Sequence, residues 1–125
     1  MAACVWDHGG GHGPLSLFWE VVASLDGDVD DESKRAGTRE GHLAELCHAA
    51  GLRDVEDDSL TITLEHTSFE DWWEPYTLGV GPAGDHVLGL DDEGRNRVIA
   101  ACRARLPEPP FEISATAWTV RATRP

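Results

Sequence analysis

Three runs of the sequence have the residue pattern of β-strands, and helical segments separate each run from the next. The runs are Ala2 to Trp6, Leu60 to His66 and Phe111 to Arg121. The second run alternates, with Leu60, Ile62 and Leu64 on one side and polar residues on the other, so we expect a half-buried strand. Strands that alternate with helices are typical of α/β proteins, and we expect residues 1–125 to form a single domain of that class.

Capping residues and apolar spacing indicate the helices between these strands. The expected helices are Leu15 to Leu25, Arg39 to Ala50, a short turn that contains Phe69, Trp72 and Trp73, and a segment from Asp91 or Asp92 to about Leu106. Pro14 suits the first position of the first helix, Thr38 is the expected N-cap of the second, and Ser68 that of the third. We expect Pro75 to end the short turn, and Gly79 to Gly84 to form a loop.

The net charge of the chain makes some classes of binding partner unfavourable. The chain has 23 acidic and 10 basic residues, which give a formal net charge of -13 at pH 7. Such a chain repels phosphate backbones and anionic lipids, so we expect neither nucleic acid nor a membrane as a partner. The acidic clusters Asp26 to Glu32 and Asp54 to Asp58 are typical of solvated loops. Three separated cysteines, with no signal peptide or apolar span, favour reduced thiols in the cytoplasm.

A glycine-rich segment, Asp7 to Gly13, lies between the first strand and the first helix. Its letters, DHGGGHG, fit an acidic-x-G-x-G-x-G pattern, which makes Gly9, Gly11 and Gly13 weak candidates for binding a nucleotide or S-adenosylmethionine. Such a site also needs a second strand that ends in a ribose-binding acid, and no such strand follows the first helix. A plain turn between strand and helix is therefore the favoured interpretation. Gly79 to Gly84 spells G-x-G-x-x-G, but no strand precedes it, so we expect a tight turn.

Several aromatic and ionisable residues are candidates for contact with a substrate. They are Trp6, Asp7, His8, His12, Trp72 and Trp73. The first three follow the opening strand, and ligands of open α/β sheets collect beyond the carboxyl ends of strands. Either His8 or His12 could act as a general base, because imidazole titrates near neutral pH. The two adjacent tryptophans diverge by about 100 degrees on a helix, so one could line a cleft while the other packs. The histidine spacing does not support a metal site, and no catalytic residue is assigned.

Several stretches resemble the C-terminal part of class I S-adenosylmethionine-dependent methyltransferases, of the methyltransferase type 11 or type 25 kind. They are VWDHGGGHGPLSLFW, the HAAGLRDVE that leads into the second strand, FEDWWEP with GVGPAG behind it, and a terminal strand ending in AW-x-V-R. The resemblance implies a partial Rossmann-like sheet with flanking helices. In it Ala2 to Trp6, Leu60 to His66 and Phe111 to Arg121 are similar to strands five, six and seven of the family. The family places strand seven between five and six, antiparallel.

In this family the residues that bind S-adenosylmethionine lie on strands one to four, which have no counterpart in this chain. The resemblance therefore implies a chain that does not bind the cofactor alone and is inactive alone. Catalysis in many of these enzymes depends on holding donor and acceptor in line. The implied activity is methyl transfer to a small-molecule acceptor once a cofactor-binding half completes the protein.

The outer edge of the first strand would pair with strand four in the intact family. An open edge is a template for pairing. We therefore expect that the chain pairs with an N-terminal methyltransferase half, self-associates, or is a truncated gene product. Slow exchange of the Cys4 and Val5 amides in a monomer would contradict the open edge.

Two other functions remain open at this point. The first is a non-catalytic interaction module derived from the same fold, which docks through the edge strand and the tryptophan pair. The second is a small binding protein that uses the Asp7 to Gly13 loop for a nucleotide-like ligand.

Overall fold

The computed structural model describes residues 1–26 and 32–125. The chain divides into two compact units, and each is described by itself. Unit 1 comprises Met1–Pro14, Glu32–Thr63 and Ser114–Pro125, and unit 2 comprises Leu15–Asp31 and Leu64–Ile113. The acidic cluster Asp26 to Glu32, apart from its two end residues, lies outside the described residues.

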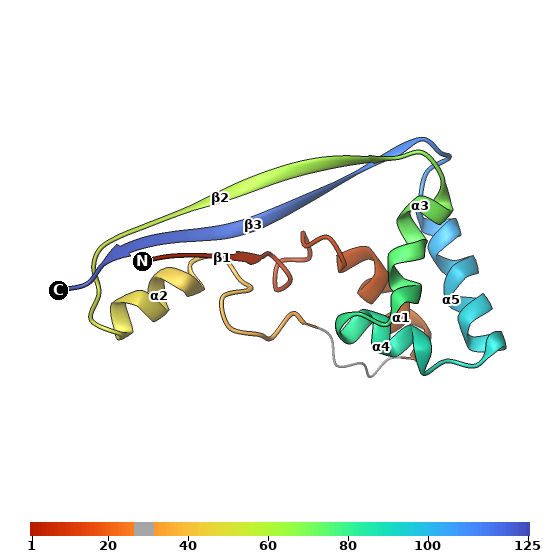
Figure 1. The fold of residues 1–125 in the computed structure, drawn as a ribbon, viewed down its shortest axis with the longest axis horizontal. Helices are drawn as coiled ribbons and strands as arrows, with labels where there is room; N and C mark the ends of the chain where they lie inside the picture. Colours follow the sequence, from red (N-terminus) through yellow and green to blue (C-terminus); the bar gives the residue numbers. More distant parts are fainter. Residues whose placement is uncertain (27–31) are drawn as a thin grey trace. The chain divides into compact units, whose positions relative to one another are not determined.

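In the described residues three antiparallel strands form the sheet, and the last strand in the sequence lies in the middle. They are β1 (Ala2–Trp6), β2 (Arg53–His66) and β3 (Phe111–Thr123), in the order β1-β3-β2 (Figure 1). Ala3 lies opposite Val120 across the first pair, and the Thr61 and Thr116 hydroxyls lie 2.9 Å apart across the second. The predicted α/β class is confirmed, as a small sheet with flanking helices.

β1 is an edge strand, and its backbone groups alternate between β3 and the outer side. The Met1 amino group donates to the Ala122 carbonyl at 2.9 Å, and the Ala122 amide donates back to the Met1 carbonyl at the same distance. Because antiparallel pairing alternates residue by residue, the Val5 amide faces β3 and the Cys4 amide faces outward. The Cys4 amide, and not that of Val5, therefore reports on the outer edge.

Helix α2 (His42–Ala49) covers one face of the sheet in unit 1. Cys47 of this helix is buried with Val120 and Ala122 of β3. The partly buried residues packed around them are Ala3, Leu43, Leu52 and Val55. This cluster anchors α2 against the middle strand.

On the opposite face of the sheet the apolar residues of β2 are exposed. Thr61 pairs with Thr116 on the α2 side, so the neighbouring Leu60 and Ile62 point to the other side. Leu60 is 62% exposed and Ile62 47%, and Leu64 in unit 2 is exposed as well. The expectation of a half-buried strand is therefore wrong. The alternation correctly put these residues on one face, but α2 packs on the other.

The helices of unit 2 enclose an aromatic core. They are α1 (Ser16–Asp26), α3 (Phe69–Trp73), the 3-10 helix η1 (Glu74–Leu78), α4 (Gly81–Leu88) and α5 (Asp92–Arg105). Phe18 is fully buried and stacks on Tyr76, with ring centroids 4.5 Å apart. Trp72 and Trp73 are buried around the same tyrosine.

The predicted cap at Ser68 and the predicted start of the last helix at Asp91 or Asp92 are confirmed. The Ser68 hydroxyl accepts a hydrogen bond from the Asp71 amide, and the Asp91 carboxylate accepts one from Gly94 at 2.7 Å. Pro14 does not occupy the first helical position, because α1 begins at Ser16.

The start of α2 differs from the prediction of a helix from Arg39 capped by Thr38. Gly41 has a φ of 79°, a left-handed conformation that cannot continue into a helix, so α2 begins at His42. The Thr38 hydroxyl instead donates to the carbonyls of Ser33 and Arg35, at 2.8 and 2.7 Å. It ties together the loop before the helix.

The segment Gly79 to Gly84 is not wholly a loop, because α4 begins at Gly81. Pro82 lies in the first turn of this helix, where its missing amide costs no hydrogen bond. Gly79 and Gly81 have φ values of 69° and 70°, so the tight bend falls just before the helix.

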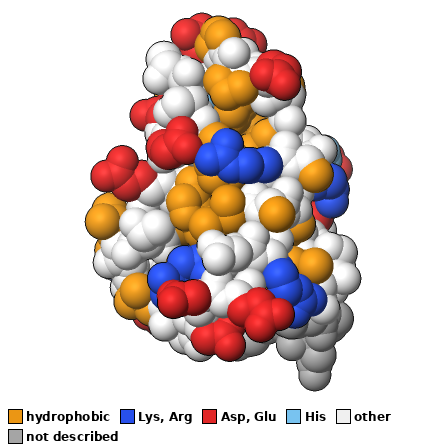
Figure 2. Space-filling view, turned by 90° about the vertical axis from the view of Figure 1, so that its right-hand side faces the viewer, with side chains coloured by type: hydrophobic (Ala, Val, Ile, Leu, Met, Phe, Trp, Pro, Cys, Tyr) orange, Lys and Arg blue, Asp and Glu red, His pale blue; other side chains and the backbone are white. Residues whose placement is uncertain are grey.

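Charged side chains of both signs share the surface. In unit 2 Arg103 pairs with Glu70 at 2.8 Å and Arg105 with Glu20 at 2.9 Å. Figure 2 shows one face of the molecule, on which basic side chains lie beside acidic and hydrophobic ones. Among the residues that the structure describes, no helix has the length and apolar character needed to cross a bilayer.

The two faces of the sheet should respond differently to substitution. Val120 is 1% exposed, so Val120→Ala should lower the free energy of unfolding by about 2 kcal/mol. Leu60→Ser should change it by less than about 0.5 kcal/mol, because the side chain is already in water. Chemical denaturation of both variants measures the difference. A loss of about 2 kcal/mol for Leu60→Ser would mean that the apolar face is covered in solution.

Candidate functional site

A buried carboxylate organises the loop that follows β1. Asp7 is 2% exposed, and its amide donates to the Thr116 carbonyl of β3 at 2.8 Å, which extends the strand pairing by one residue. Its Oδ1 accepts hydrogen bonds from the Gly10 amide and the Trp118 indole N–H, both at 2.9 Å. Its Oδ2 accepts one from His12 Nδ1 at 2.8 Å. A buried carboxylate needs such partners to offset the loss of water.

The glycines of this loop are explained by the fold itself. A Cβ on Gly10 would lie 2.5 Å from the Asp7 carboxylate oxygens, and one on Gly9 would lie 2.9 Å from the Thr38 carbonyl. Gly11 has a φ of 79°, which favours glycine. These contacts support the interpretation of Asp7 to Gly13 as a turn between strand and helix.

The amides of the loop also have acceptors within the protein. Gly9 donates to the Thr38 carbonyl at 2.8 Å, Gly10 to Asp7, and Gly11 to the His8 carbonyl at 3.3 Å. Gly13 is buried. A phosphate- or nucleotide-binding loop directs free amides at its ligand, and the amides of Gly9 to Gly11 are already used.

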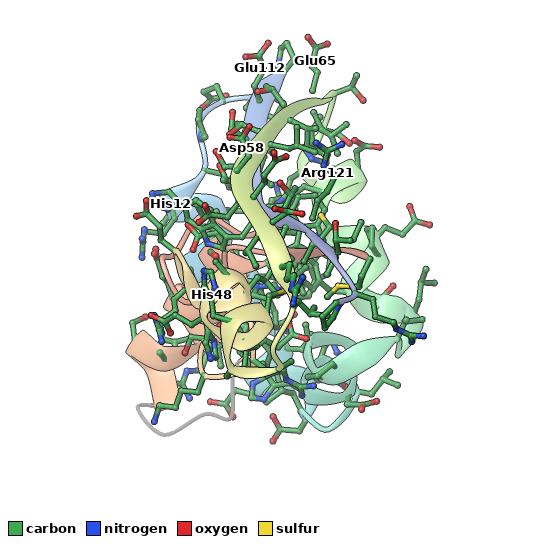
Figure 3. The ribbon with its side chains drawn as sticks, turned by 90° about the vertical axis from the view of Figure 1, so that its left-hand side faces the viewer. His12, His48, Asp58, Glu65, Glu112 and Arg121 are labelled. Carbon is green, nitrogen blue, oxygen red and sulfur yellow. The ribbon has the colours of Figure 1, made fainter. Side chains whose placement is uncertain are left out.

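His12 is the residue of this loop best placed for chemistry. Its side chain is 71% exposed, while Nδ1 is held by Asp7, and Figure 3 labels it. Donation from Nδ1–H to the carboxylate leaves Nε2 of the neutral ring with a lone pair facing solvent. The backbone is fixed as well, because the His12 amide donates to the Asp7 carbonyl and its carbonyl accepts from Thr116. The arrangement is a proton acceptor oriented by a buried acid.

The other sequence candidates are less available. His8 is partly buried, with Nε2 3.7 Å from the Glu32 carboxylate. Trp6 is 36% exposed at the end of β1. Trp72 and Trp73 are both buried in the core of unit 2, so neither indole presents a face to solvent.

Sequence reasoning found Asp7 and His12 but missed two of their partners. Trp118 lies 111 residues from Asp7 and reaches it only because β3 pairs with β1. Gly10 is not among the glycines of the predicted cofactor motif, yet its amide donates a hydrogen bond to the Asp7 carboxylate.

A second feature of unit 1 is a hollow of about 690 Å³ on the sheet, which we call the sheet hollow. It is lined by Ala2, Ala3, Cys4, Glu56, Asp57, Asp58, Leu60, Thr119, Val120 and Arg121. Arg121 donates to Glu56 at 2.7 Å, and this hydrogen bond raises the pKa of the guanidinium. Asp58 and Arg121, on the neighbouring strands β2 and β3, are labelled in Figure 3. The sheet hollow therefore combines apolar residues with an acidic border.

Within residues 1–26 and 32–125 no group of three or more His, Cys, Asp or Glu side chains is arranged to hold a metal ion. No protein-family model matches this chain, and no match was found among the curated proteins.

The Asp7 network should be sensitive to small changes. Asp7→Asn places an amide group among donors and should lower the free energy of unfolding by about 2 kcal/mol. Gly10→Ala should destabilise by a similar amount, because its Cβ would meet the carboxylate. Gly89→Ala is the control, since its Cβ would make ordinary contacts at 3.5 Å or more. Equal stability of Gly10→Ala and Gly89→Ala in chemical denaturation would contradict the network.

The three cysteines should differ in reactivity. All are free, with Cys4 exposed and Cys47 and Cys102 buried. Burial raises the pKa of the Cys102 thiol to about 11, so little thiolate forms there at neutral pH. Iodoacetamide should modify Cys4 alone in the folded protein, and all three after unfolding, as peptide mass mapping would show. Modification of Cys102 as fast as Cys4 would contradict the packing.

Proposed function

We propose that this chain is the C-terminal part of a class I S-adenosylmethionine-dependent methyltransferase, with a partial Rossmann-like sheet. The observation that carries the proposal is the strand order. β3 is last in sequence, lies between β1 and β2, and runs antiparallel to β1. The family sets strand seven between strands five and six in the same manner. The sequence stretches that resemble the family are the second support.

The residues of this chain do not fit S-adenosylmethionine on their own. The segment Gly9 to Gly11 has the sequence that most resembles a cofactor-binding loop. Its backbone amides, however, donate hydrogen bonds to acceptors within the protein. In this proposal the methyl donor is held by a cofactor-binding half that lies outside residues 1–125, and residues 1–125 alone are inactive. Without the cofactor-binding half, the methyl donor and the acceptor are not held in line. The methyl transfer then loses the rate enhancement that comes from proximity.

The contribution of this chain to the completed enzyme is on the acceptor side. A small-molecule acceptor would lie against the end of β1, near Trp6. His12 Nε2 would accept the proton that the acceptor releases, while Asp7 keeps Nδ1 protonated and the ring oriented. His8, partly buried against Glu32, is the less favoured base.

A cytoplasmic location belongs to the same proposal. The three free cysteines support it, because disulfides are rare in that compartment.

A non-catalytic interaction module is the second candidate function. The observation that favours it is the exposed apolar face formed by Leu60 and Ile62. The proposed interaction module does not dock through Trp72 and Trp73, because both side chains are buried.

Calorimetric titration with S-adenosylmethionine and S-adenosylhomocysteine tests the cofactor assignment. The chain alone should give no saturable heat at millimolar ligand. Saturable binding that Gly11→Val abolishes would make the Asp7 to Gly13 loop a cofactor site and overturn the strand assignment. Gly41→Val is the control, because Gly41 also has a positive φ but lies outside this loop.

Co-expression separates the two candidate functions. The second polypeptide should carry a strand, an acidic-x-G-x-G-x-G loop and a helix, encoded beside this chain's gene. The pair should bind S-adenosylmethionine, and His12→Gln should lower kcat for methyl transfer by about a hundredfold or more without loss of cofactor binding. A stable pair that never binds the cofactor would favour the interaction module.

A further inference from the structure

Hydroxyl side chains gather on the α2 side of the sheet, beyond the part that α2 covers. The Thr61 and Thr116 hydroxyls lie 2.9 Å apart across β2 and β3, and those of Thr63 and Ser114 lie 2.8 Å apart. Residues two apart on a strand share a face and are separated by about 7 Å. The four side chains, which we call the hydroxyl ladder, therefore form a regular polar surface. Thr61, Thr63 and Ser114 are exposed, because α2 packs farther along β3.

The hydroxyl ladder adjoins the Asp7–His12 pair. The Thr116 amide donates to the His12 carbonyl, and the Asp7 amide donates to the Thr116 carbonyl, both at 2.8 Å. Trp118 lies two residues along β3 on the same face, and its indole N–H donates to Asp7 at 2.9 Å. The half-buried indole and the His12 ring held by Asp7 therefore lie next to the ladder, within unit 1.

Each hydroxyl pair of the ladder keeps hydrogen-bonding capacity for a ligand. A hydroxyl can donate one hydrogen and accept at two lone pairs. One of the two hydrogens in a pair is used between the partners, so the other can be donated to a ligand oxygen, and lone pairs can accept from ligand hydroxyls. A compound with several hydroxyl groups offers donors and acceptors on neighbouring atoms, and it therefore matches this surface.

The charge of this face favours a neutral ligand. The residues that alternate onto it from Ser59 to Thr63 on β2 and from Ser114 to Trp118 on β3 include no Lys or Arg, so these strands offer an anion no cation. The Asp7 carboxylate already accepts hydrogen bonds at both oxygens, so it does not select a cation. An apolar ligand would take the hydroxyls out of water without replacing their hydrogen bonds.

We propose that the hydroxyl ladder, with Trp118 beside it, binds a neutral polyhydroxylated ring compound of the monosaccharide or cyclitol class. Hydroxyl groups of the compound exchange hydrogen bonds with the two pairs, and a C–H face of its ring packs on the indole. Under the proposed function this compound is the acceptor substrate. That role alone rests on the proposed function, and the binding site itself does not.

Titration of the whole chain, followed by protein NMR, tests the site without a methyl donor. The probes are glucose, mannose, ribose and myo-inositol. The controls are cyclohexanol, which has a single hydroxyl on a six-membered ring, and glucuronate, which is charged. At least one probe should shift the Trp118 indole N–H and Thr116 amide signals saturably, with a Kd of about 10 mM or below. Both controls should bind at least about tenfold more weakly.

Matched variants assign the binding to the hydroxyls. The double variant Thr61→Val, Thr63→Val replaces each hydroxyl with a methyl group of similar size and should weaken binding at least about tenfold. The double variant Thr119→Val, Thr123→Val is the control, because both residues alternate onto the opposite face of β3. It should leave the affinity unchanged. The amide spectrum of each variant, recorded in the same titration, verifies that the fold is retained.

Three results would overturn the proposal. They are the absence of saturable shifts with every neutral probe at about 100 mM, equally tight binding of cyclohexanol or glucuronate, and an equal loss of affinity in the control variant. None of them bears on the methyl-donor titration or on co-expression. Conversely, if the chain binds a neutral probe but the completed pair transfers no methyl group, the proposed function fails and the binding site stands.

Discussion

The pairing of β3 with both other strands is the constraint on which unit 1 depends. β1 has five residues and is held to the sheet through β3 alone. The same pairing brings Trp118 and Thr116 to Asp7, so that its carboxylate can be buried with its hydrogen bonds satisfied. Once Asp7 is fixed, Gly10 and His12 are fixed with it. The loop geometry is thus a consequence of strand register more than of its glycines.

Patterns that depend on neighbouring residues predicted most of the secondary structure. β1, the body of α1, the cap at Ser68 and the limits of α5 follow from apolar runs and short polar side chains, which act locally. The start of α2 and the whole of α4 were missed, and both helices begin at or after a glycine in the left-handed conformation, Gly41 or Gly81. A glycine permits such a conformation, but its presence in the sequence does not show that the conformation is adopted.

Burial was harder to predict, because it depends on what packs against an element. The alternation around Leu60 showed which side chains share a face, and only the position of α2 showed that this face is left exposed. Adjacent Trp72 and Trp73 diverge on their helix, yet both are buried, since Phe69 and Tyr76 contact each of them. The Asp7 site was found in part, because its loop position was visible while its contact with Trp118 required the register.

The structure combines a loop that orients His12 with a sheet whose first strand lies at an edge. The loop holds His12 against the buried Asp7 carboxylate, and β1 lies at the edge of the sheet. Both features have one explanation under the proposed function, in which a cofactor-binding half completes this sheet. The glycine-rich sequence after β1 suggests a cofactor loop. In the structure its glycines form the turn that holds His12 against Asp7.

The central claim is that the outer edge of β1 is unpaired in the chain alone. Hydrogen exchange at single amides tests it most directly, because neighbouring residues of β1 face opposite ways. In the monomer the Cys4 amide should exchange at least about tenfold faster than that of Val5, which faces β3. Equally slow exchange at both amides would mean that the outer edge is already paired and would contradict the account.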